Sequence, residues 1–84
     1  MERIDELLGT REQTHGDFTH HSEITMALKA TMEEQVSWER LSPVQKEALH
    51  MIQHKIGRIL AGNPDFKDHW DDIAGYAKLV SDRL

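Results

Sequence analysis

The sequence predicts an all-α protein, a small four-helix bundle in a single domain that spans residues 1–84. Three observations favour this class. Apolar residues recur three and four positions apart along most of the chain, which is the spacing of one helix face. Runs of β-branched residues are few. A chain of 84 residues is also one small domain. The expected bundle has one short N-terminal helix and three longer ones.

The first helix is expected over residues 2–8, and its apolar residues share one side: Ile4, Leu7 and Leu8. Gly9 predicts its end, because glycine takes the left-handed conformation of a helix stop at little cost. Residues 10–17 are polar and include Gly16, so we expect a loop there.

The second helix is expected to begin at a cap formed by Asp17 or Thr19 and to run to about Val36. Residues 37–41 are then a connector, and Trp38 within it is expected to close the end of the bundle.

The third helix is expected over residues 43–61 and has the strongest start signal in the chain. Ser42 at the cap, Pro43 at the first helical position and Gln45 three residues after the cap fit a capping box. Gly57 inside this helix costs about 1 kcal/mol relative to alanine, so it indicates that another helix packs closely there.

The fourth helix is expected to start at Asn63 and Pro64, directly after a stop at Gly62. A turn this short makes helices three and four an antiparallel hairpin. The fourth helix carries an apolar seam with steps of three and four: Phe66, Trp70, Ile73, Ala77, Val80 and Leu84. We expect this seam, and Trp70 with it, to face the core.

Composition excludes several classes of function. The chain has no cysteine, which rules out disulfides, thiolate metal sites and thiol nucleophiles. Its net charge of -5 disfavours nucleic acid as a partner. No apolar run approaches the roughly 20 residues that span a bilayer, and the N-terminus does not look like a secretory signal. We expect a soluble, cytoplasmic protein without a membrane partner. So short a chain has a small core, which favours a homo-oligomer.

An acidic group beside the seam of the fourth helix is the first candidate site. Asp68 and Asp72 are four residues apart, so their carboxylates project from one side of the helix. Glu33 and Glu34, late in the second helix, are expected to face them across the bundle. Carboxylate oxygens suit Mg²⁺, so these four residues form a candidate magnesium site. The alternative is that the aspartates only complement the positive end of the helix dipole.

Basic residues of the third helix complete this candidate site. Lys55 and Arg58 are three residues apart and can bind one anion together, such as the phosphate of a nucleotide. Tyr76, four residues after Asp72, borders the acidic side and is a candidate for stacking on a base or orienting a carboxylate. The alternative for Lys55 and Arg58 is an interhelical salt bridge to Asp68 or Asp72.

Two segments carry a resemblance to a known group of proteins. The stretch HKIGRILAGNPDFKDHWDDIAGYAKLV over residues 54–80, and the element Thr14-His15-Gly16-Asp17-Phe18, resemble small phage and prophage proteins of uncharacterised role. These look like distant variants of the all-α nucleoside triphosphate pyrophosphohydrolases, the MazG and dimeric dUTPase superfamily.

The resemblance implies a helical fold that hydrolyses a nucleoside triphosphate to the monophosphate and pyrophosphate with Mg²⁺. Asp72 would take the place of the last metal-binding aspartate, and Lys55 that of a phosphate-binding residue. The chain departs from the pattern at His69, which stands where a glutamate is expected, and no ExxE pair is present.

Two functions therefore stay open, and they belong to different classes. The first is a phage-derived pyrophosphohydrolase-like enzyme in which Asp68 and Asp72 act as catalytic and metal-binding residues. The second is a non-enzymatic module that binds a host or phage protein through its acidic face, a reading that the missing glutamates favour. A structural oligomer without a ligand is the third, simpler possibility.

Overall fold

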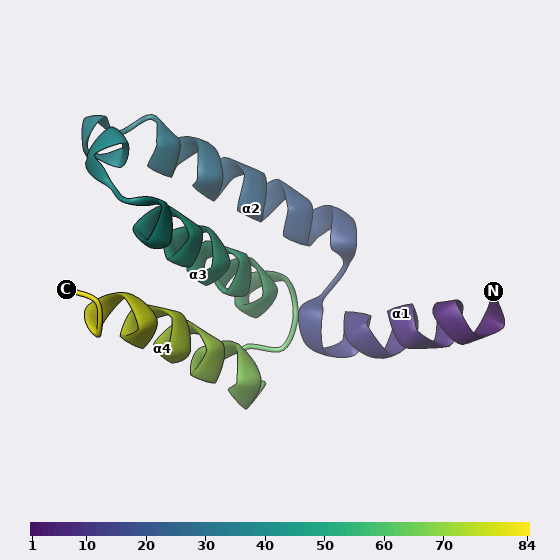
Figure 1. Cartoon of the computed structure of the whole chain (residues 1–84). Helices are drawn as coiled ribbons and strands as arrows, with labels where there is room; N and C mark the ends of the chain where they lie inside the picture. Colours follow the sequence, from purple (N-terminus) through teal and green to yellow (C-terminus); the bar gives the residue numbers. More distant parts are fainter.

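The computed structural model describes all 84 residues and contains helices only, which confirms the all-α prediction. Four α-helices and one 3-10 helix follow one another in the order α1 (Glu2–His15), α2 (Phe18–Glu33), η1 (Val36–Arg40), α3 (Pro43–Ala61) and α4 (Lys67–Ser81). Helix α3 lies between α2 and α4, with α4 antiparallel to it as expected, and α1 projects away from these three (Figure 1). None of the helices combines the length and the apolar character that a membrane crossing requires.

Helix α1 is longer than predicted, and the expected stop at Gly9 is wrong. The helix continues through Gly9 to His15, so residues 10–15 of the predicted loop are helical and only Gly16 and Asp17 connect α1 to α2. The chain turns out of the helix at Gly16, which has the positive φ of 85° that glycine adopts at little cost. Gly9 is an ordinary helical residue.

Helix α2 begins where the capping signal predicts and ends early. The Asp17 side chain accepts a hydrogen bond from the backbone N–H of His20, as an N-cap does. The helix ends at Glu33 rather than near Val36, and the chain continues as η1. Trp38 is buried as expected, with its ring centroid 5.0 Å from that of His50 on α3.

Helix α3 has the predicted bounds, and both hydrogen bonds of the Ser42–Gln45 capping box are present. Gly62 ends the helix. The turn to α4 is longer than expected, because Pro64 lies in the turn and α4 starts only at Lys67.

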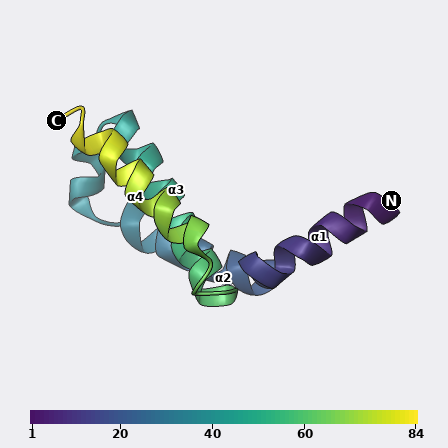
Figure 2. The same ribbon diagram turned by 90° about the horizontal axis from the view of Figure 1, so that it is seen from below.

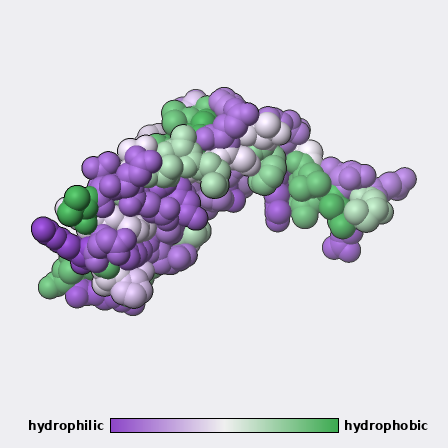
Figure 3. Space-filling model, turned by 90° about the horizontal axis from the view of Figure 1, so that it is seen from above, coloured by the Kyte–Doolittle hydropathy of each residue, from purple (hydrophilic) through white to green (hydrophobic).

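The core of the chain is small and largely polar. Only Trp38 and Ala48 are buried hydrophobic residues. The other buried side chains are polar or charged: His21, Thr25, Gln53, Lys55 and His69. Much of the surface is hydrophilic, but hydrophobic atoms also lie along the projecting arm (Figure 3).

The predicted burial of Trp70 is wrong, because α4 is rotated relative to its apolar seam. Trp70 is 54% exposed, and its indole N–H donates to the carbonyl oxygen of Pro64. The preceding residue, His69, faces inward instead and is 1% exposed. Its Nε2 lies 3.0 Å from the carbonyl oxygen of Thr14, so the imidazole can be buried with a hydrogen-bonding partner.

Glycines lie at two places where segments of the chain approach each other closely. A Cβ on Gly57 would lie 2.5 Å from Thr25 Cγ2 and 2.9 Å from His21 Cδ2, so the close approach of α2 predicted at Gly57 is confirmed. At the base of α1, Gly16 packs on the backbone of Ala61 and Gly62. This second crossing places the end of α1 against the turn between α3 and α4.

Candidate functional site

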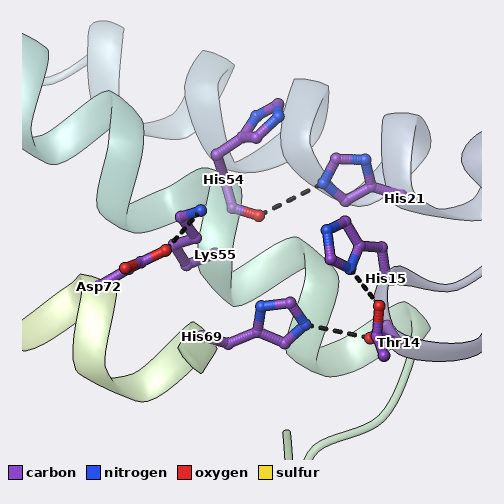
Figure 4. A network of polar contacts seen from close by, with 7 residues as sticks. All are labelled: Thr14, His15, His21, His54, Lys55, His69 and Asp72. Carbon is purple, nitrogen blue, oxygen red and sulfur yellow. Dashed lines mark hydrogen bonds and ion pairs between the residues drawn. The ribbon is translucent and has the colours of Figure 1, made fainter. Parts of the chain in front are cut away.

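The structure brings Lys55 of α3 and Asp72 of α4 together (Figure 4). Lys55 Nζ lies 2.9 Å from Asp72 Oδ2, and the lysine side chain is buried whereas the carboxylate is half exposed. The hydrogen bond from Lys55, followed by the positive charge of Lys55, lowers the pKa of Asp72. Arg58 contributes to the same lowering, so both predicted basic residues lie near Asp72.

The other predicted acidic residues lie elsewhere. Asp68 is exposed on the first turn of α4 and forms no ion pair, whereas its neighbour Asp71 pairs with Lys67. Glu33 Oε1 lies 3.3 Å from His50 Nε2, and Glu34 is exposed.

No three histidine, aspartate or glutamate side chains lie in a position to hold a metal ion together. The four predicted magnesium ligands are therefore not assembled into a site within one chain.

Tyr76 lies apart from the basic residues as well. It is half-buried and lines a shallow groove between α3 and α4 with Val44, Leu79 and Val80. The groove is mostly apolar, and Lys55 and Arg58 do not line it.

A larger pocket lies in the angle between α1, the start of α2 and α3, with a volume of about 480 Å³. Its wall combines cationic, imidazole and apolar groups, which include Leu8, Arg11, His15, Phe18, His54 and Arg58. Two acidic residues, Glu12 and Asp17, also line it. The carboxylate of Asp17 is occupied as the N-cap of α2.

Two guanidinium groups converge on this pocket. Burial lowers the pKa of Arg58, and the charge of Arg11 lowers it further, while Asp72 acts in the opposite direction. Asp72 is itself paired with Lys55, and neither arginine takes part in any of the four ion pairs of the chain. The pocket therefore holds a partly buried positive charge that no carboxylate of the protein contacts.

Three imidazole groups also line this pocket, those of His15, His21 and His54, and Figure 4 shows them close to one another. The pKa of His15 is lowered from 6.5 to about 4, first by burial and then by the charges of Arg58, His69, Lys55 and Arg11.

Burial also lowers the pKa of His54, and His21 and Arg58 add to this lowering. His15 and His54 are therefore uncharged at neutral pH, where a neutral ring can donate or accept a hydrogen bond.

The histidines are held in place by backbone and side-chain groups. His15 Nδ1 lies 2.7 Å from the hydroxyl of Thr14, and His21 Nε2 lies 3.3 Å from the carbonyl oxygen of His54. The rings of His21 and His54 meet edge to face with centroids 4.7 Å apart. The contacts between His21 and His54 connect the start of α2 to α3, whereas the Thr14–His15 contact lies within the last turn of α1 (Figure 4).

Sequence reasoning found Arg58 but missed Arg11 and His15, because both were placed in a loop. The signal that could have found them is the helical spacing of Ile4, Leu8, Arg11 and His15, which continues across Gly9.

A protein-family model described as "Domain of unknown function (DUF6378)" matches residues 1–83. No curated protein and no solved structure matches the chain.

Proposed function

The chain belongs to the DUF6378 family, whose description gives no function, and from the site itself we propose that it binds the phosphate groups of a nucleoside triphosphate. The ligand would occupy the pocket between α1, α2 and α3, with Arg11 and Arg58 on its phosphates.

The observation that carries this proposal is the partly buried guanidinium group of Arg58, which has no carboxylate partner and lies on the same pocket wall as the exposed Arg11. A charge that is partly buried without a counter-ion is unfavourable, and a bound anion offsets that cost. Arginine presents a planar fork of N–H groups that matches phosphate oxygens. A volume of about 480 Å³ also falls within the size range of pockets for small ligands. The neutral rings of His15 and His54 can add hydrogen bonds to the ligand.

Hydrolysis of the bound nucleotide to the monophosphate and pyrophosphate is the stronger form of this proposal. In this form we propose that Mg²⁺ is the cofactor, that the chain is related to the MazG and dimeric dUTPase superfamily, and that it originates from a phage. The residues of one chain do not form a metal site by themselves. Mg²⁺ commonly binds one or two protein carboxylates together with substrate phosphates, so Asp68 and Asp72 would suffice only with the nucleotide present.

Calorimetric titration with nucleoside triphosphates, with and without Mg²⁺, tests the binding. We expect saturable binding that weakens at least about tenfold in Arg58→Gln, from the loss of a charge-assisted hydrogen bond. The matched control is Arg40→Gln, which removes the same charge from an exposed position on η1. Absence of binding, or equal affinity of the Arg58→Gln protein and the wild type, would contradict the proposal.

Product analysis separates binding from catalysis. Release of pyrophosphate that requires Mg²⁺ and is lost in Asp72→Asn would support the enzymatic form. Binding without any product would remove that form and leave the binding function standing.

The exposed acids at the start of α4 favour a second candidate function. Asp65 and Asp68 are exposed and form no ion pairs. A basic surface of a host or phage protein would be the complementary partner. Capture of such a protein by the wild type, and its loss with Asp65→Lys and Asp68→Lys together, would support this function. Equal capture by the variant would exclude the acidic face as the contact.

A further inference from the structure

Helix α1 has almost no support from the rest of the chain. Every residue from Met1 to Gln13 is exposed, and the helix stands away from the other three in two perpendicular views (Figures 1 and 2). Only its last turn is anchored by hydrogen bonds to the body, through the carbonyl oxygen of Thr14, which accepts from the backbone N–H of Asn63 and the ring of His69. The remainder of the helix is exposed, and it faces the body only across the open pocket that Leu8, Arg11 and Glu12 line.

An unsupported helix of this kind is not expected to persist in water. Isolated helices shorter than about 12–15 residues are marginal even in alanine-rich sequences. Helix α1 has 14 residues, and Gly9 in its interior costs it about 1 kcal/mol relative to alanine. Its stability therefore requires a surface that covers it.

The side of α1 that needs covering is apolar. Ile4, Leu7 and Leu8 are 48–55% exposed and lie on one face. Leu8 also lines the pocket, together with Phe18 of α2, whose side chain is 79% exposed. The apolar face of α1 thus continues onto the start of α2 as one surface, which we call the arm face: Ile4, Leu7, Leu8 and Phe18.

The chain exposes more surface than a compact monomer of its mass, and the excess is large enough to form a dimer interface. Its accessible surface is 6214 Å², against about 5,100 Å² expected for a compact monomer of 9.7 kDa. The difference is about 1,100 Å², and a standard stable interface buries roughly 800 Å² on each partner. The radius of gyration of 14.5 Å likewise exceeds the roughly 12 Å expected for a compact domain of this length.

We propose that the arm face is the interface of a homodimer, in which each α1 packs against the arm face of a second copy of this chain. Helix α1 lacks a packing surface within its own chain. The partner that supplies this surface must therefore be present whenever the chain is folded, and a second copy of the chain meets that condition. The interface would be isologous, with the same residues on both chains. Leu8 and Phe18 belong both to the arm face and to the wall of the proposed nucleotide pocket. The interface does not require a bound nucleotide, so a measurement without nucleotide tests it apart from the proposed function.

Light scattering coupled to size exclusion, over a series of protein concentrations without nucleotide, tests the proposal. We expect the mass of two chains for the wild type. The double variant Ile4→Glu, Leu7→Glu should shift to the mass of one chain. Its dimer dissociation constant should rise at least about 30-fold, the effect expected when hot-spot residues of an interface are replaced. The control, Val36→Glu, changes an 80% exposed apolar residue on η1 and should remain a dimer.

Amide hydrogen exchange shows whether the double variant keeps its body folded. The amides of residues 5–13, which donate within α1, should be protected in the wild type and unprotected in the variant, while the hydrogen-bonded amides of α3 stay protected in both. A wild type with the mass of one chain at all concentrations would overturn the proposal. So would a double variant that remains dimeric with a protected α1.

Discussion

Replacement of Gly57 by alanine is predicted to destabilise the protein, although alanine is the better helix former. The new methyl group would lie 2.5 Å from Thr25 Cγ2 and 2.9 Å from His21 Cδ2. Both neighbours are buried. Both are also held by hydrogen bonds, His21 to the carbonyl oxygen of His54 and Thr25 to that of Ser22. Helices α2 and α3 must therefore separate to admit the methyl group.

Two opposing terms decide the size of the effect. Alanine in place of glycine inside a helix gains about 1 kcal/mol. Overpacking of a well-packed contact costs about 1–3 kcal/mol, and contacts this short between fixed neighbours belong at the upper end. We expect a net loss of about 2 kcal/mol, which lowers the Tm by about 8–16 °C for a domain of this size.

Gly75 provides a matched control in α4. A Cβ there would meet no atom within 4 Å, and the residue is exposed within the helix. Gly75→Ala should therefore keep the whole propensity gain, about 1 kcal/mol, and raise the Tm by about 4–8 °C. Thermal and urea unfolding followed by circular dichroism, at equal protein concentrations, measures both variants. A Gly57→Ala protein as stable as Gly75→Ala would refute the close packing of α2 on α3.

Three further predictions concern the buried polar groups. His69→Ala should lower the free energy of unfolding by about 2–4 kcal/mol, because it leaves a cavity and removes the hydrogen bond to Thr14. His69→Gln keeps an N–H donor and should lower this free energy by less. Urea titrations measure both variants. Stability should fall as the pH drops from 6.5 to 4, because the pKa of His15 is about 4 when folded and 6.5 when unfolded, so the unfolded chain binds the extra proton within this window. Unfolding midpoints over this pH range measure the slope, and His15→Gln should make it shallower. Asp72→Asn should lower the Tm, because it leaves the buried Lys55 without a counter-ion. Adding Lys55→Met should restore part of the lost Tm. A double variant with a Tm no higher than that of Asp72→Asn would argue against this explanation.

Much of the fold could be predicted from local signals. The capping box at Ser42 and the cap at Asp17 depend on hydrogen bonds within a few residues, so they are readable in the sequence. The close helix contact at Gly57 could be predicted as well, because a glycine inside a helix lowers its stability and a close contact with another helix offsets that loss. The Lys55–Asp72 pair was one of two alternatives and is present.

The failures have a common physical origin in tertiary contacts. Gly9 was expected to end α1, but whether a glycine ends a helix depends on the turn that follows, and that turn is fixed at Gly16 by packing on Ala61 and Gly62. Trp70 was assigned to the core by its hydrophobicity. His69 is buried instead because a carbonyl from residue 14, distant in sequence, accepts its hydrogen bond.

The candidate site was only partly predictable for the same reason. Arg58 was found because it lies on a clear helix, whereas Arg11 reaches the pocket only because α1 continues past Gly9. The pairing of Glu33 with His50 could not be read from either segment alone, since the two residues are 17 positions apart on different helices.

Because α1 is anchored at its C-terminal end alone, a change of its direction there moves its N-terminal end the farthest. The carbonyl oxygen of Thr14 accepts hydrogen bonds from both the backbone N–H of Asn63 and the ring of His69, so the turn before α4 sets the direction in which α1 leaves the body. A helix of 14 residues is about 20 Å long, so a tilt of about 10° at this pivot displaces its N-terminal end by about 3.5 Å. Small sequence changes between residues 62 and 66 would thus be magnified at the far end of the arm.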